Sequence, residues 1–348
     1  MKPMLITMGD AAGIGPEIIA KVWRDHPADA AGCAVVGDVA TMRRAAALVA
    51  APLALAVAEF DSLDDFVAHE QPPNCPNCIF VLQKCERLAP VSIGLVNGFV
   101  GQAAADCIVW AAQAVLNGQA SAMVTAPIHK EALAAAGGWA AQFPGHTEML
   151  QAEAAKFLGK KIADLPARMM LANDELKTVL VSIHMSLRQA IEAVTFDNVL
   201  QTLHITHSAL SKTLGRAPHI GVAGLNPHAG EGGLFGSEEQ TIIMPAIAAA
   251  KANGMHVSGP FAPDTVFMRA RSKPSAAGEF DVVVAMYHDQ GLIPVKYLGV
   301  EQGVNVTLGL PLIRTSPDHG TAFDIAGTGK ADEASLLAAI RMARNLAA

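Results

Sequence analysis

The order of apolar and helical segments in this sequence predicts an α/β fold with a largely parallel sheet. Short runs of apolar and β-branched residues recur along the chain, as in strands that are buried on both faces. Stretches with a helical spacing of apolar residues lie between them, for example residues 16–26 and 237–254. Strands and helices that alternate in this way are typical of sheets whose strands are joined by crossover helices.

Each expected strand is a short run that ends in a turn or in polar residues. In chain order, the runs are MLITM (4–8), CAVVGD (33–38), CIFVLQ (78–83), AMVTAP (122–127), TVLVSIH (178–184), HIGVAGLNP (219–227) and FDVVVAMYH (280–288). The polar residues at or just after their ends include Thr125, His184, Asn226, His228, His288 and Asp289. Because ligands of open α/β sheets gather at the carboxyl ends of strands, we expect the functional site there.

Composition indicates a folded protein without a nucleic-acid or membrane partner. Of the 348 residues, 51% are hydrophobic and 16% charged, which disfavours disorder and suits two domains or one large one. The net charge is -7, and no run of like charges is available to hold nucleic acid or an anionic membrane. The apolar run at 45–58 is broken by Pro52 and is shorter than the roughly 20 residues of a membrane-spanning helix. The N-terminus has no room for a secretory signal, so we expect a cytoplasmic protein.

The cysteines do not form an obvious disulfide pattern. There are 5 of them, an odd number, which favours reduced thiols. Cys75 and Cys78 form a CPNC pair of a kind used in redox or zinc chemistry, but no second pair accompanies it and its surroundings are typical of a loop. The role of this pair stays open.

Two glycine-rich segments lie near the ends of the chain. In GDAAGIGPE (9–17) the glycines permit a close backbone approach before Pro16 starts a helix, although a simple strand-to-helix turn would look the same. The second segment is HGTAFDIAGTGKADE (319–333). Together they resemble the GDGIGPE-like turn and the HGSAPDIAG-like loop of the isocitrate and isopropylmalate dehydrogenase superfamily. That resemblance implies a loop that holds the adenosine part of NAD or NADP through His319, Gly320, Thr321, Ala322 and Asp324.

Three of the 12 histidines close or follow expected strands, namely His184, His228 and His288. A single histidine is more often a core or surface residue than a ligand. The wide spacing of these three excludes a local zinc-finger arrangement and suits ligands that converge from strand ends. Three neutral imidazoles with an open position suit Zn²⁺, Co²⁺ or Ni²⁺.

Further motifs extend along the chain to residue 327. They are MGDAAGIGPE, VTAPIHKEAL, FPGHTEML, GLNPHAGEGG, GPFAPDTVF, MYHDQGLIPVKYLG and GVNVTLGLPLIRTSPDHGTAFDIAG. In this order they resemble PdxA, the 4-hydroxythreonine-4-phosphate dehydrogenase family. The resemblance implies metal ligands at His184, His228 and His288, and substrate contacts at His146, Thr147, Lys296, Asn305 and Arg314, with Asp264 and Asp289 as weaker candidates. Without it, His146 and Thr147 also fit a simple helix cap.

The resemblance further implies a three-layer α/β/α fold of two domains with an active-site cleft between them. Residues 1–122 and 300–348 would form a discontinuous domain with the C-terminal loop, and residues 123–299 a second domain with the metal ligands and dimer contacts.

The resemblance also implies an activity and an assembly. PdxA enzymes oxidise the C3 hydroxyl of 4-phosphooxy-L-threonine with NAD or NADP. The product loses CO₂ to give 3-amino-2-oxopropyl phosphate, in pyridoxal 5'-phosphate biosynthesis. The implied assembly is a homodimer whose active site lies at the subunit interface, with Zn²⁺ as the first choice of metal and Mg²⁺ or Co²⁺ as alternatives.

One segment departs from the biosynthetic pattern and leaves alternatives open. IGLVNGFVGQAAADCIVWAAQAV (93–115) favours a PdxA2-like branch that oxidises 4-phospho-D-threonate or 4-phospho-D-erythronate. A branch that oxidises aromatic dihydrodiols fits less well, because Thr147, Lys296 and Arg314 keep a site for a phosphorylated acid. A non-redox metalloenzyme and a protein that only binds its ligand are the remaining alternatives, and NAD binding would separate the first of them from a dehydrogenase.

Overall fold

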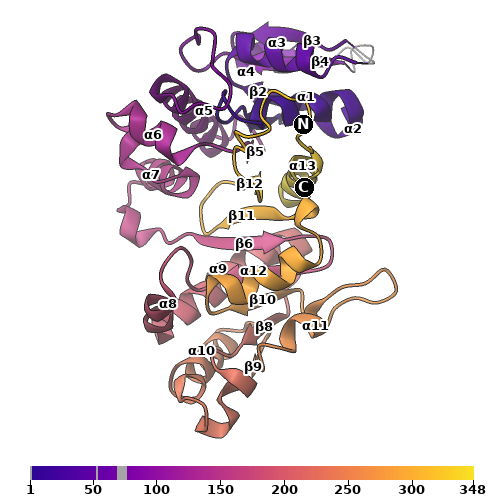
Figure 1. The fold of residues 1–348 in the computed structure, drawn as a ribbon. Coiled ribbons are helices and arrows are strands. Elements are labelled where there is room, and N and C mark those ends of the chain that lie inside the picture. Colours follow the sequence, from indigo (N-terminus) through magenta and orange to yellow (C-terminus); the bar gives the residue numbers. More distant parts are fainter. Residues whose placement is uncertain (1, 52–53, 69–76) are drawn as a thin grey trace. The chain divides into compact units, whose positions relative to one another are not determined.

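The computed structural model describes residues 2–51, 54–68 and 77–348, and its chain divides into two compact units (Figure 1). Unit 1 is Met1–Pro166 with Leu310–Ala348, and unit 2 is Ala167–Gly309. The chain passes from unit 1 to unit 2 after Pro166 and returns to unit 1 at Leu310. Both positions lie further along the sequence than the domain limits expected at 122/123 and 299/300. The first lies later because residues 123–166 belong to unit 1, where strand and helices pack against the N-terminal part of the chain.

The sheet of unit 1 is entirely parallel over its described strands. Its strand order is β3 (Ala56–Phe60), β4 (Cys78–Leu82), β2 (Cys33–Val36), β1 (Met4–Thr7), β5 (Ala122–Thr125) and β12 (Arg314–Pro317). Every residue of β1, β2, β4 and β5 is buried, which confirms the strands expected from uninterrupted apolar runs. The last strand places Arg314 opposite Met123 of β5, although the two residues are far apart in sequence.

Helices cover both faces of this sheet. Figure 1 shows α5, α6 and α7 on one side and α1 and α13 on the other. The helices are α1 (Gly15–Asp25), α2 (Pro27–Ala30), α3 (Val39–Leu48), α4 (Leu63–Ala68), α5 (Gly98–Leu116), α6 (Lys130–Ala136), α7 (His146–Leu158) and α13 (Ala334–Ala347), with 3₁₀ turns at Ala140–Gln142 and Ile162–Asp164. Pro16 lies in the first turn of α1, and the side chains of Asp38 and Asn97 cap α3 and α5.

Helix α5 is long and apolar enough to cross a membrane by length and composition alone. In the structure 67% of its apolar window is buried, and the helix packs on α6, α7 and the sheet. Core helices of folded domains pass the same test, so this property is weak support for a membrane span. Among the described residues it is the one helix that passes the test.

The sheet of unit 2 is mixed. Its order is β11 (Val304–Leu308), β6 (Arg168–Ala172), β7 (Lys177–Leu180), β10 (Val282–Ala285), β8 (Ile220–Ala223) and β9 (Val257–Phe261). The strands from β7 to β9 are parallel, whereas β6 runs antiparallel to both of its neighbours. The expectation of a largely parallel sheet is therefore confirmed, with β6 as the exception.

The helices of unit 2 are α8 (Leu187–Ala193), α9 (Phe196–Leu214), α10 (Met244–Ala252), α11 (Val266–Ala270) and α12 (His288–Tyr297), with a 3₁₀ turn at Val300–Gln302. Helices α11 and α12 share a core with Leu180, Val283 and Ala285, which point to one face of the sheet. The alternate residues Val282 and Val284 are also buried, so the other face is covered as well. The helix expected at 237–254 begins as a π-helix at Glu239–Ile243 and continues as α10.

The described cysteines are free thiols. Cys33, Cys78 and Cys107 are buried and Cys85 is half-buried. Cys78 lies on β4 in the core of unit 1, while Cys75 of the CPNC pair lies outside the described residues.

Candidate active site

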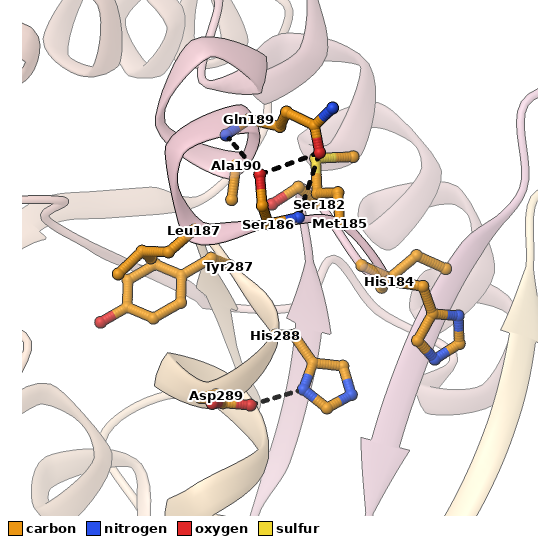
Figure 2. A pocket seen from close by; sticks show the side chains of 11 residues that line it. Ser182, His184, Met185, Ser186, Leu187, Gln189, Ala190, Tyr287, His288 and Asp289 are labelled. Atoms are coloured by element: carbon orange, nitrogen blue, oxygen red, sulfur yellow. Dashed lines mark hydrogen bonds and ion pairs between the residues drawn. The ribbon is translucent and has the colours of Figure 1, made fainter.

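In unit 2, a cavity of about 550 Å³ opens where β7 and β10 end (Figure 2). It is lined by Ser182, Ile183, His184, Met185, Ser186, Leu187, Gln189, Ala190, Tyr287, His288 and Asp289. The chain turns from buried β10 directly into α12, which begins at His288. A capping box between Ser186 and Gln189 starts α8 on another wall of the cavity. Two expected metal ligands, His184 and His288, are thus brought to one cavity.

The two imidazoles lie close together. Their ring centroids are 5.6 Å apart, and His288 Nδ1 is 2.7 Å from Asp289 Oδ1 (Figure 2). A carboxylate that bonds one nitrogen of an imidazole fixes the ring and its tautomer, and so presents the other nitrogen to a metal. This donor chemistry fits a divalent transition metal.

The third expected ligand, His228, has a different setting. It lies in the turn after β8 with 66% of its side chain exposed, and its Nδ1 is 3.6 Å from Glu231 Oε2. Within the described parts of the chain, no three His, Cys, Asp or Glu side chains are grouped so that they could hold a metal ion. One chain therefore brings together two of the three expected histidines.

A buried cation in unit 1 bonds the last residue of β5. Arg314 on β12 is 4% exposed and donates from Nε and Nη2 to Thr125 Oγ1, at 3.0 and 2.7 Å. Burial lowers the pKa of Arg314 to about 10, against the opposing influence of Glu148, so the group remains charged at neutral pH. A buried guanidinium favours an anion in its surroundings.

His146 lies beside this cation at the start of α7. Burial and the Arg314 charge hold the pKa of His146 well below its usual range, against a hydrogen bond to the Ala126 backbone. Its Nε2 is buried without a hydrogen-bond partner among the described residues. Gly145 occupies the N-cap position of α7 and no side chain caps the helix, so His146 and its neighbour Thr147 do not act as caps. An unpartnered buried nitrogen beside a buried cation is the setting of a ligand-binding group.

The two glycine-rich segments meet within unit 1. Ile14 N donates to Thr321 O at 3.0 Å, and Glu17, which is 3% exposed, accepts from Gly327 N at 2.8 Å and from Ala331 N at 3.2 Å. Lys21 Nζ also donates to Ala331 O. Gly13 allows the close approach, because a Cβ there would lie 2.9 Å from the Thr321 Cβ.

The loop that these contacts hold has features of a binding loop. Ala322 has a left-handed backbone with φ of +41°, and such strain in a non-glycine residue is often found at functional sites. His319 Nδ1 is 3.0 Å from Gly320 O, and its Nε2 is buried with no hydrogen-bond partner in the described parts of the chain. Asp324 is exposed. These residues fit a loop that binds a polar group such as a nucleotide.

Comparison with known proteins assigns the chain to a family. A family model described as "Pyridoxal phosphate biosynthetic protein PdxA" matches residues 29–343. The chain belongs to the PdxA family. It is 49% identical to 4-hydroxythreonine-4-phosphate dehydrogenase of Beijerinckia indica over 99% of this chain and 95% of that protein. It is also 43% identical to D-threonate 4-phosphate dehydrogenase of Pectobacterium atrosepticum, over 99% of both chains. The crystal structure of 4-hydroxythreonine-4-phosphate dehydrogenase from Klebsiella pneumoniae matches all of both chains with a TM-score of 0.84 and 40% identity.

The other expected residues of this PdxA protein lie on separate elements of unit 2. Lys296 is in the last turn of α12, Asn305 is half-buried on β11, and Asp264 is exposed between β9 and α11. The structure also singles out Thr125 and Glu17, to which the sequence analysis gave no specific role. Thr125 had a signal in the sequence, since it ends an apolar run, whereas Glu17 looked like an ordinary first-turn residue of a helix.

Proposed function

We propose that this PdxA protein oxidises the C3 hydroxyl of 4-phosphooxy-L-threonine with NAD or NADP in the cytoplasm. The 3-keto acid formed loses CO₂, so that the products are 3-amino-2-oxopropyl phosphate, CO₂ and the reduced nicotinamide. The observation that carries the proposal is the 49% identity, over 99% of the chain, with a relative named 4-hydroxythreonine-4-phosphate dehydrogenase. The geometry of the two units supports particular roles for the residues.

Anionic groups of the substrate are bound by Arg314 and its neighbours in this proposal. The buried guanidinium supplies the positive charge, and Thr125 fixes its orientation through two hydrogen bonds. His146 is neutral because of its lowered pKa, so its unpartnered Nε2 can bond a substrate group without adding charge. Further contacts come from Thr147, Lys296 and Asn305, with Asp264 as a candidate partner for the substrate amine.

A divalent cation is held by His184 and His288 in this proposal, and Asp289 orients His288. Zn²⁺ is the first choice, with Co²⁺ and Mg²⁺ as alternatives. His228 is the third ligand, and a homodimer with the active site at the subunit interface would complete the set, since one chain does not group the three residues. When bound, the cation stabilises negative charge that develops on the reacting oxygen, and the nicotinamide accepts the two electrons of the oxidation.

The cofactor adenosine is bound by the C-terminal loop in this proposal. The residues are His319, Gly320, Thr321, Ala322 and Asp324. Glu17 supports the loop from α1 through the backbone amides of Gly327 and Ala331. The unpartnered Nε2 of His319 and the strained backbone of Ala322 are the observations that favour a ligand here.

A second candidate is oxidation of 4-phospho-D-threonate, which carries a hydroxyl where the biosynthetic substrate carries an amine. Relatives with 43% identity over 99% of the chain are named D-threonate 4-phosphate dehydrogenase. Both substrates carry a phosphate and a carboxylate, which the positive charges of Arg314 and Lys296 suit. These two side chains therefore do not distinguish one substrate from the other.

The test is reduction of NAD and NADP by the purified, Zn²⁺-supplied protein with each substrate in parallel. A higher kcat/KM for 4-phosphooxy-L-threonine supports the first candidate, and a higher value for 4-phospho-D-threonate supports the second. Binding of a metal without reduction of either nicotinamide would contradict both and would favour a non-redox metalloenzyme.

A further inference from the structure

The turn that carries His228 has an uncommon backbone. From His228 to Gly232, five successive φ angles are positive, at 53°, 53°, 80°, 42° and 67°. Three of these residues, His228, Ala229 and Glu231, are not glycine and so prefer other conformations. A run of this kind persists only where its surroundings hold it in place.

One buried carboxylate holds the start of this turn. Glu239, at the beginning of the π-helix, is 2% exposed. Its Oε1 accepts from Leu225 N at 2.7 Å and from Asn226 N at 2.8 Å, and its Oε2 accepts from Asn226 Nδ2 at 3.0 Å. These are the two residues that lead from β8 into Pro227 and His228.

Two glycines make room for the carboxylate. A Cβ on Gly224 would lie 3.1 Å from Glu239 Oε1, and a Cβ on Gly230, in the middle of the left-handed run, would lie 2.7 Å from Oε2. The turn therefore closes around the Glu239 side chain at its start and at its centre. Burial raises the pKa of Glu239, but the hydrogen bonds from Asn226 and Leu225 outweigh it and lower the pKa overall.

The same segment is linked to the strand ends that carry the other two histidines. Gln290 of α12 donates to Gly224 O at 2.8 Å and accepts from Met286 N at 2.7 Å. Ser182, two residues before His184, donates to Met286 O at 3.0 Å. The ends of β7, β10 and β8 are thus joined by side-chain bonds to the backbone.

We propose that Glu239 is a positioning residue, which holds the left-handed turn so that His228 is presented for metal binding. The inference rests on the proposed function, in which His228 is a metal ligand. Glu239 itself touches neither substrate nor metal in this proposal. Its effect on the metal is carried entirely by Leu225, Asn226 and the turn that follows them.

The experiment compares the full-length wild-type protein with Glu239→Gln, Glu239→Asp and His228→Ala. Glu279→Gln is the matched control, since Glu279 is a half-exposed carboxylate of the same unit that pairs with Arg269. Hydrogen exchange at the Leu225 and Asn226 amides is measured on metal-free protein, and Co²⁺ binding is measured by calorimetry. Replacement of a residue that orients a ligand typically weakens metal binding by about 10–100-fold.

We expect faster exchange at both amides and a 10–100-fold higher Kd for Co²⁺ in Glu239→Gln, with a smaller change in Glu239→Asp and none in Glu279→Gln. Saturating Co²⁺ should restore kcat in Glu239→Gln, and KM for the substrate should stay unchanged. A general loss of protein stability would not give this combination of results. If Glu239→Gln does not fold, Glu239→Asp carries the same test.

Two outcomes overturn the inference in different ways. Wild-type exchange and wild-type Kd in both Glu239 variants, with weakened binding in His228→Ala, would remove the role of Glu239 and leave the proposed function intact. Wild-type Co²⁺ affinity in His228→Ala would instead remove His228 from the metal site, and the inference would fall with that part of the proposed function.

Discussion

Arg314 and Thr125, which are 189 residues apart in sequence, form a pair in which one guanidinium donates two hydrogen bonds to one hydroxyl. The pair exists because β12 lies parallel to β5 with Arg314 in register with Met123, so that Arg314 and Thr125 lie on the same face of the sheet. These bonds fix the orientation of the buried guanidinium group. The Arg314 side chain therefore does not have to be ordered when a substrate anion binds to it.

Thr125→Val removes the accepting hydroxyl and keeps the shape of the side chain. A hydrogen bond to a charged group contributes about 1.5–3 kcal/mol, so we expect kcat/KM for the phosphorylated substrate to fall by about 10–100-fold. The control is Thr315→Val, because Thr315 is also buried on β12 but donates to Ala339 O. Thr315→Val should lower stability and leave kcat/KM near the wild-type value. Equal losses of activity in the two variants would contradict the role of Thr125.

The lowered pKa of His146 predicts a pH dependence of stability. The unfolded chain binds a proton at His146 near pH 6.5, whereas the folded chain binds it only at much lower pH. The free energy of unfolding therefore falls as the pH drops below about 6.5, by at most ~1.4 kcal/mol per pH unit from this group. Urea unfolding at pH 7.5, 6.5, 5.5 and 5.0 should show a smaller fall in His146→Gln than in the wild type. If the free energy of unfolding falls with pH by the same amount in His146→Gln and in the wild type, His146 is not held neutral by its surroundings.

Removal of the proposed metal ligands should abolish turnover without unfolding the protein. His184 and His288 are exposed or half-exposed at strand ends, so His184→Ala and His288→Ala leave no cavity in the core. Loss of several kcal/mol of charge stabilisation lowers kcat by at least about 100-fold, and a chelator should do the same to the wild type. Metal content and kcat are measured together.

The matched control for these variants is His204→Ala, an exposed histidine of α9 that lies near Asn253. It should keep the metal content and the kcat of the wild type. Full activity in metal-stripped His184→Ala or His288→Ala would contradict a catalytic metal at this cavity.

Glu17→Gln should weaken cofactor binding more than substrate binding. The carboxylate accepts two backbone amides of the C-terminal segment, and the neutral amide has only one accepting oxygen. We expect the free energy of unfolding to fall by about 2 kcal/mol and KM for NAD or NADP to rise several-fold, with KM for the substrate nearly unchanged. Glu131→Gln, at an exposed carboxylate in the first turn of α6, is the control. Equal rises in both KM values would mean that Glu17 supports the fold rather than the loop.

Most strands within nearly continuous apolar runs were predictable from the sequence, and a mostly polar strand such as β12 was not. Every apolar run that predicted a strand contains one, including β1, β2, β8 and β10. The prediction missed β3, β6, β9, β11 and β12. In β12, RTSP, all residues are buried although three of them are polar. Arg314 and Thr315 can be buried because Thr125 and Ala339, on other elements, accept their hydrogen bonds, and local sequence does not reveal such partners.

The sequence by itself determined the α/β class, the glycine-rich turns and the chemistry-bearing residues at strand ends, because these features follow from local periodicity and short motifs. It did not determine which residues support the site. The contacts of Thr125 with Arg314, of Glu17 with Gly327 and of Glu239 with Asn226 join segments that lie on different elements. Such contacts were decided by the tertiary structure, since a buried polar group takes its partner from whichever element packs against it.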